Sequence, residues 1–118
     1  GRRFVGTGGT QIGEKTLNAE RMATLQKLLQ MDPKDVFSHY ALGLEHLEQN
    51  AAEAERCFLR VLELDTQYVA AYFQLGQLKA ELGDIESSQS WLEKGIEVAE
   101  QVGDQHALGE MQDFLDQL

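Results

Sequence analysis

The sequence predicts an all-α protein built from stacked helical hairpins, and three observations support this fold class. From Leu17 onward, apolar residues recur at steps of three and four, the spacing of an amphipathic helix. The helical pattern repeats after 33 to 34 residues, so that Gly43 aligns with Gly76 and Phe58 aligns with Leu92. No four-residue apolar run has the character of a buried strand. A chain of 118 residues is long enough for one domain with one modest core.

The first helix is expected over residues 17–32, after a tail that is expected to be flexible. Five glycines fall within the first thirteen residues, and glycine-rich chain of this kind behaves as a flexible linker. The tail therefore covers residues 1–16. The helix that follows ends at Asp32 and Pro33, because proline disfavours helical conformation in the residue before it.

The next four helices are expected to form two hairpins. The first hairpin covers residues 35–66, and its helices separate at Asn50. The second hairpin covers residues 68–101, and its helices separate at a Gly-Asp turn. Residues 104–118 carry apolar side chains on one side, so we expect a final helix that caps the open end of the stack.

Residues 17–118 resemble the tetratricopeptide repeat (TPR), a family of paired helices with a period of 34 residues. The resemblance implies a right-handed solenoid of helical hairpins with a C-terminal capping helix. Glycine inside a helix costs about 1 kcal/mol relative to alanine, so we expect Gly43 and Gly76 to lie where a second helix approaches closely. The matching residues are Leu42, Gly43, Ala54, Phe58, Tyr72, Leu75, Gly76, Gly83, Asp84 and Leu92. The residues that depart from the family pattern are His39, Thr66, Ser88 and Gly95.

The resemblance also implies where a partner binds. In a TPR stack, the first helix of each pair lines a concave inner surface that holds a peptide. The residues implied for this inner face are Phe37, Tyr40, Leu44, Phe73 and Gln77, with Glu48 and Glu81 toward its edge. Exposed apolar patches commonly mark a partner surface. We therefore expect a non-enzymatic protein-interaction module whose partner is a peptide or helix with an apolar segment and a basic flank.

Two other occupants of the inner face remain open at this point. The helix over residues 17–32 could cover it, or a second copy of the chain could close it in a homodimer. A carboxylate clamp, which one TPR subclass builds from Lys, Asn and Arg, is not expected, because Tyr40, Leu44 and Gln74 hold the corresponding positions.

The segment GTGGTQIGEKT, residues 6–16, comes within one residue of a phosphate-binding loop. In such a loop the lysine directly follows the last glycine and reaches the outer phosphates. Here Glu14 displaces Lys15 by one position and adds a negative charge where phosphates would lie. Only Phe4 and Val5 precede the glycines, too few for the buried strand that such a loop requires. A nucleotide-binding enzyme is therefore the least favoured alternative.

No metal or other cofactor is expected from the sequence. His39 and His46 are seven residues apart, about 10 Å along a helix, and cannot share one ion directly. Cys57 lacks a recognisable Cys, His and acid constellation and is expected to be a small core residue. Trp91 is expected to anchor packing.

The charge distribution excludes some partners. The formal net charge is -10, and residues 16–118 carry seven basic side chains against nineteen acidic ones. Such a body repels phosphate backbones, so nucleic-acid binding is not expected. No apolar run approaches 18 residues, and no membrane span is expected. The single cysteine fits a reducing compartment, so we expect the cytoplasm, although the chain begins with Gly1 and not with Met.

Overall fold

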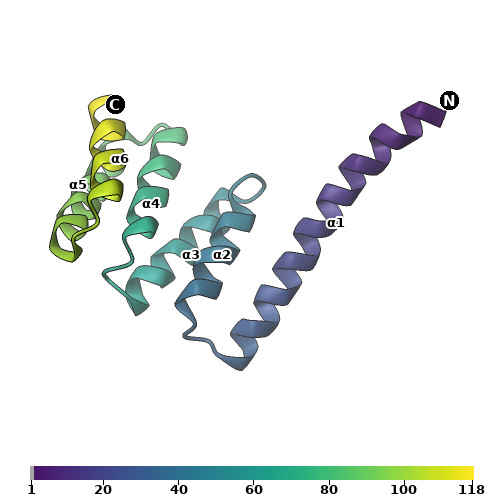
Figure 1. Ribbon diagram of the computed structural model, residues 1–118, viewed down its shortest axis with the longest axis horizontal. Coiled ribbons are helices and arrows are strands. Elements are labelled where there is room, and N and C mark those ends of the chain that lie inside the picture. The colour runs from purple at the N-terminus through teal and green to yellow at the C-terminus, as the bar shows by residue number, and fades with distance from the viewer. Residues whose placement is uncertain (1) are drawn as a thin grey trace.

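The computed structural model describes the backbone of residues 2–118 and the side chains of residues 17–118. Within this part of the chain there are six α-helices and no β-strand (Figure 1). The helices are α1 (Arg2–Met31), α2 (Val36–His46), α3 (Ala51–Leu64), α4 (Val69–Glu81), α5 (Ile85–Val102) and α6 (Gln105–Asp116). The predicted all-α fold class is confirmed, and α2 to α6 begin and end within about three residues of the expected positions.

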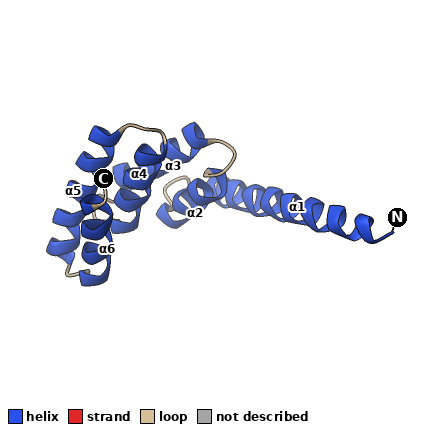
Figure 2. Ribbon diagram, turned by 90° about the horizontal axis from the view of Figure 1, so that it is seen from above, coloured by secondary structure: helices blue, strands red, loops and turns tan. Residues whose placement is uncertain are grey.

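The first helix is longer than the sequence pattern predicts. We expected a helix from residue 17, but α1 runs without a break from Arg2 to Met31. No proline interrupts this segment, and its glycines lower helix propensity by about 1 kcal/mol each without blocking the helical backbone. Both views show the N-terminal half of α1 extending away from the other helices (Figures 1 and 2). The flexibility of residues 1–16 stays a prediction, and Gly1 lies outside the described residues.

The helical conformation also bears on the glycine-rich segment at residues 6–16. Its backbone lies inside α1, and no strand precedes it among the described residues. A phosphate-binding loop needs a strand leading into a bent, glycine-rich backbone whose N–H groups point at the phosphates. The described structure offers neither feature at this position.

Local side-chain chemistry sets the start of the later helices. The side chains of Asn50, Asp84 and Asp104 accept hydrogen bonds from backbone N–H groups in the first turns of α3, α5 and α6, respectively. Each cap satisfies an N–H group that has no partner within its own helix. Gly83 and Gly103 have φ values of 83° and 80°, a left-handed conformation that favours glycine. These caps and turns make each hairpin compact.

Consecutive helices pack against each other along the whole chain, and α4 also contacts α6. The helices alternate between two layers. One layer contains α2, α4 and α6, and the other contains α3 and α5, which are the second helices of the two hairpins. A salt bridge of 3.0 Å between Lys79 Nζ and Glu55 Oε2 joins α4 to α3. The molecule is elongated, with extents of 55 × 37 × 24 Å.

The two repeat glycines lie at close helix crossings, as predicted. A Cβ atom built on Gly43 would lie 2.6 Å from Cε1 of Phe58, and one on Gly76 would lie 2.7 Å from Cδ2 of Leu92. Carbon atoms in contact normally stay about 3.5–4.0 Å apart. Phe58 and Leu92 are fully buried. Only glycine therefore permits these approaches.

Two further close contacts occur at residues that depart from the family pattern. A Cβ atom on Gly95 would lie 2.5 Å from the sulfur of Met111, so α6 packs directly on the α5 backbone. The Oγ atom of Ser88 donates a hydrogen bond of 2.6 Å to the carbonyl oxygen of Gly76. Each departure thus has a local packing or hydrogen-bonding role.

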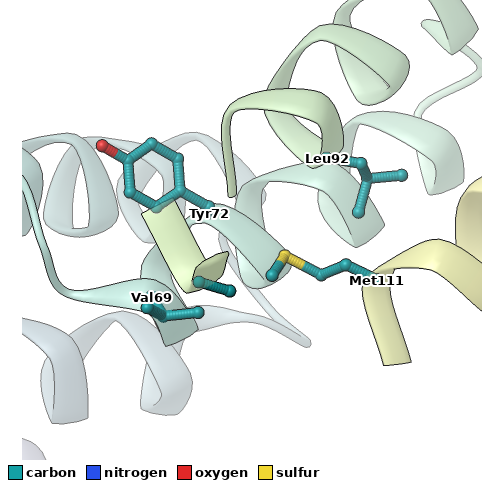
Figure 3. Close-up of a cluster of buried hydrophobic side chains, with 5 residues drawn as sticks. Val69, Tyr72, Leu92 and Met111 are labelled. Atoms are coloured by element: carbon teal, nitrogen blue, oxygen red, sulfur yellow. The ribbon is translucent and has the colours of Figure 1, made fainter. Parts of the chain in front are cut away.

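The core consists of two neighbouring clusters, and α4 contributes residues to both. The first is centred on Phe58 and Leu75, between α2, α3 and α4. The second joins α4, α5 and α6, and Figure 3 shows Val69, Tyr72, Leu92 and Met111 converging in it. The partly buried side chains of Leu62 and Trp91 pack against both clusters. The predicted anchoring role of Trp91 is confirmed, because its side chain packs against both clusters.

Candidate interaction surface

Phe37 and Leu44 form an exposed apolar stripe on α2. They are seven residues apart and so lie on the same side of the helix. Their exposed fractions are 66% for Phe37 and 39% for Leu44, although α1 packs against α2. The described part of α1 therefore does not cover these two side chains. Large apolar groups left in water forgo about 1.5–3 kcal/mol each, so this stripe is suited to a partner.

Tyr40 takes part in packing between the repeats. Its ring centroid lies 5.6 Å from that of Phe58 and 5.1 Å from that of Tyr68. Its hydroxyl accepts a hydrogen bond of 3.4 Å from Nε2 of Gln74 on α4. Burial raises the pKa of the Tyr40 hydroxyl, with a smaller lowering from Gln74. Tyr40 thus holds α2 against α4, with part of its surface still exposed.

Phe73 also contributes to internal packing. Its ring meets that of Phe114 edge to face, with centroids 5.9 Å apart and an interplanar angle of 81°. This contact joins α4 to α6 and adds about 0.5–1.5 kcal/mol to the packing. Phe73 is half-buried and lies beside the second core cluster. Its role in partner binding stays a prediction.

The remaining three predicted residues line one hollow between the end of α2 and α4. Glu48, Gln77 and Glu81 surround a hollow of about 430 Å³ together with Leu47, Gln74 and Leu78. The structure thus brings Gln77 and both predicted edge acids together. Leu47, Gln74 and Leu78 were missing from the predicted site. Finding these three residues requires knowing how α2 and α4 lie next to each other. Aligning the two repeats in sequence does not give this arrangement.

A second hollow lies between α1 and the segment after α2. It has a volume of about 610 Å³ and is lined by Asn18, Ala19, Met22, Ala23, Gln26 and Gln49. Beside it, Glu45 accepts hydrogen bonds from Nδ2 of Asn18 and, at 3.0 Å, from Nε of Arg21. The Arg21 hydrogen bond, aided by Asn18, lowers the pKa of the Glu45 carboxyl. These polar contacts position α1 on α2.

Cys57 is buried in the core, as expected, but its neighbours differ from the expectation. No Cys, His and acid constellation was expected around it, yet ligand atoms of His46, Glu53 and Cys57 lie within 4.8 Å of one another. His39 lies elsewhere, with Nε2 placed 2.8 Å from the carbonyl oxygen of Pro33. Burial, and then the Glu53 carboxylate, raise the pKa of the Cys57 thiol to about 11. At neutral pH this group is a thiol, which is a poor nucleophile.

The described helices also bear on the membrane prediction. None of the helices between residues 2 and 118 combines the length and apolar character needed to cross a bilayer.

Known proteins similar to this chain share its helical-hairpin architecture. A family model described as the tetratricopeptide repeat matches residues 69–102. A TPR repeat-containing protein of Pseudomonas aeruginosa is 30% identical over 95 residues, which cover 80% of this chain and 90% of that protein. The solution structure of a tetratricopeptide repeat domain protein from Salinibacter ruber is 39% identical, with a TM-score of 0.69, over 73% of this chain and 88% of that one.

A more distant similarity extends over nearly the whole chain. The crystal structure of PcrH in complex with the chaperone binding region of PopD has a TM-score of 0.78 and covers 97% of this chain and 85% of PcrH. At 16% identity, this similarity concerns the fold.

Proposed function

Because the chain belongs to the tetratricopeptide-repeat family, we propose that it is a protein-interaction module whose inner face binds an apolar peptide or helix. The observation that carries this proposal is the exposed pair of Phe37 and Leu44 on one side of α2. Nothing in the proposed role requires catalysis. PcrH, which has the same fold, was crystallised with a segment of a partner protein, so this architecture is compatible with such a ligand.

The charge around the inner face indicates the chemistry of the partner. Glu48 and Glu81 line the hollow between α2 and α4, and Glu48 follows Leu44 by four residues. The ligand therefore places apolar side chains on Phe37 and Leu44 and a Lys or Arg side chain near the two carboxylates. The hollow supplies Gln74 and Gln77 as further hydrogen-bonding groups.

A displayed library of random peptides tests this function without the natural partner. We expect the chain to enrich peptides that combine apolar anchors with a basic flank. The double substitution Phe37→Ser and Leu44→Ser is expected to weaken the binding of the enriched peptides at least tenfold. The reason is that each lost apolar contact is worth about 1.5–3 kcal/mol when fully buried. Fluorescence anisotropy with a labelled peptide measures the change.

A matched control tests whether the loss of binding is specific to the inner face or follows the loss of any exposed apolar side chain. Val102 is 44% exposed and is the last residue of α5, which contributes no residue to the α2 stripe or to the hollow between α2 and α4. Val102→Ser is expected to leave peptide binding unchanged. If the double serine variant kept its helical content and bound the peptide as tightly as the parent chain, the proposed surface would be contradicted.

Self-association through the same face is the competing proposal. Met31, at the end of α1, is also exposed, so apolar surface is available on both α1 and α2. Light scattering over a range of concentrations distinguishes the two. A monomer at high micromolar concentration supports the peptide site, whereas a dimer that the Phe37 and Leu44 substitutions abolish would support homodimerisation.

A further inference from the structure

The hairpin formed by α2 and α3 brings three potential metal ligands together at one point. His46 is the last residue of α2, while Glu53 and Cys57 lie four residues apart on α3. Their ligand atoms all lie within 4.8 Å of one another. We propose that His46, Glu53 and Cys57 form a binding site for one divalent cation of the zinc class. This departs from the sequence prediction of no metal, which considered the two histidines and Cys57 separately.

The backbone around the turn fixes the relative position of the three residues. The N–H group of Asn50 donates to the carbonyl oxygen of His46 at 2.8 Å. The Asn50 side chain in turn accepts from the N–H group of Glu53 at 3.2 Å. One residue thus ties the end of α2 to the first turn of α3. Glu53 and Cys57 then share a face because residues four apart are neighbours on a helix.

The three groups match the ligand preferences of zinc. Cysteine sulfur binds Zn²⁺ at about 2.3 Å, and imidazole nitrogen and carboxylate oxygen bind at about 2.0–2.2 Å. In a tetrahedral site these bond lengths place the ligand atoms about 3.3–3.8 Å apart. The ligand atoms lie within 4.8 Å of one another, so the separations have to close by at most about 1–1.5 Å. We expect rotation of the partly exposed His46 and Glu53 side chains to close this gap, with the exposed Arg56 side chain moving together with Glu53.

The charges around the site are also compatible with a cation. A thiolate and a carboxylate together balance the two positive charges of the metal. Both contacts from Arg56 go to Oε1 of Glu53, one of them Nε to Oε1 at 2.8 Å, so Oε2 is the oxygen that we assign to the cation. Arg56 is itself largely exposed, so water screens its charge. It positions the carboxylate and does not touch the metal.

Binding replaces the thiol proton with the metal. The S–H bond of Cys57 breaks, a bond from Sγ to the cation forms, and the proton passes to solvent. Cys57 is only 7% exposed, whereas His46 and Glu53 are partly exposed, so the ion approaches from the side of these two residues. With three protein ligands, the fourth tetrahedral position is left to a water molecule. A bound ion would join the end of α2 to the first half of α3.

Titration of the untagged full chain with Co²⁺ tests this site. Cobalt bound to a thiolate absorbs in the near ultraviolet, so the signal reports Cys57 directly. We expect saturation at one equivalent, loss of the band when Zn²⁺ is added, and a higher thermal unfolding midpoint in the presence of Zn²⁺. Absence of a thiolate-to-cobalt band in the folded chain would overturn the proposal.

Substitutions identify the ligands. His46→Gln, Glu53→Gln and Cys57→Ser are each expected to weaken Co²⁺ binding at least tenfold, and Cys57→Ser also removes the band. The first two replace partly exposed side chains, so they keep the test valid even if Cys57→Ser does not fold. The control His106→Gln removes a histidine that pairs with Glu110 on α6, at 3.4 Å, and is expected to bind as the parent chain does. Unchanged affinity in both His46→Gln and Glu53→Gln would contradict the site.

Discussion

At the scale of single residues, small side chains determine how closely the helices pack. Gly43, Gly76 and Gly95 each occupy a position where a methyl group would overlap a buried side chain of the next helix. Gly109, on α6, has no atom within 4 Å of such a methyl group. All four are glycines inside helices, yet only three have a packing reason to be glycine.

This difference gives a matched pair of substitutions. Gly43→Ala is expected to destabilise the chain by about 1–2 kcal/mol, because overpacking against Phe58 costs more than the helix gains. Gly109→Ala is expected to stabilise it by about 0.5–1 kcal/mol, because alanine is the better helix former and nothing obstructs it. Urea unfolding followed by circular dichroism measures both. A similar increase in stability for the two variants would refute the close crossing at Gly43.

The sequence predicted some of these residue roles and not others. Gly43 and Gly76 were identifiable because they recur at the repeat period inside helices, where glycine is costly. Gly95 and Ser88 were recognised only as departures from the family pattern. Their roles depend on Met111 and Gly76, which lie on neighbouring helices, and the sequence does not show these contacts. The grouping of His46 with Glu53 and Cys57 was missed for the same reason, since it depends on how the α2–α3 turn aligns two helices.

At the scale of the helices, α2 to α6 could be predicted well and α1 could not. Pro33, Asn50, Gly83 and Gly103 are residue types that favour the start or end of a helix. They occur where the apolar periodicity also breaks, so both signals predict the same helix boundaries. The N-terminal segment contains glycines but no proline or cap, so sequence composition there does not fix where the helix begins. For the proposed surface, the sequence could place the predicted residues on α2 and α4, but which of their side chains are exposed and which are packed depends on the neighbouring helices.

The contact between α1 and α2 predicts a specific pH dependence. Because Arg21 and Asn18 lower the pKa of Glu45, its stabilising effect is present above the ordinary pKa of about 4.5 and is lost as the pH falls through the lowered value. Glu45→Gln is therefore expected to cost about 0.5–1 kcal/mol at pH 7 and clearly less near pH 3. Urea unfolding at both pH values measures the difference.

A control for this prediction lies on α3. Glu63 makes an exposed contact of 3.5 Å with Arg60 within the same helix, so Glu63→Gln is expected to change the free energy of unfolding little at either pH. If Glu45→Gln cost the same at pH 3 as at pH 7, the ionised carboxylate would not be what stabilises the α1–α2 contact.

At the scale of the whole molecule, the two hairpins form one continuous stack. Leu62 and Trp91 pack against both core clusters, and Tyr40 joins α2 to α4 through Gln74. Repeats that contact mainly their neighbours hold a shared surface in place through such links. Tyr40 and Phe73 therefore support the proposed inner face by packing, whereas Phe37 and Leu44 are its exposed apolar side chains.

The central claim is that the face of α2 and α4 receives the partner. Hydrogen–deuterium exchange of the chain, alone and with a peptide enriched from the library, tests it most directly. The account predicts slower exchange in α2 and α4 around Leu44 and Gln77, with the outer surfaces of α3 and α5 little changed. Protection confined to α3 and α5, with α2 and α4 unaffected by a bound peptide, would contradict it.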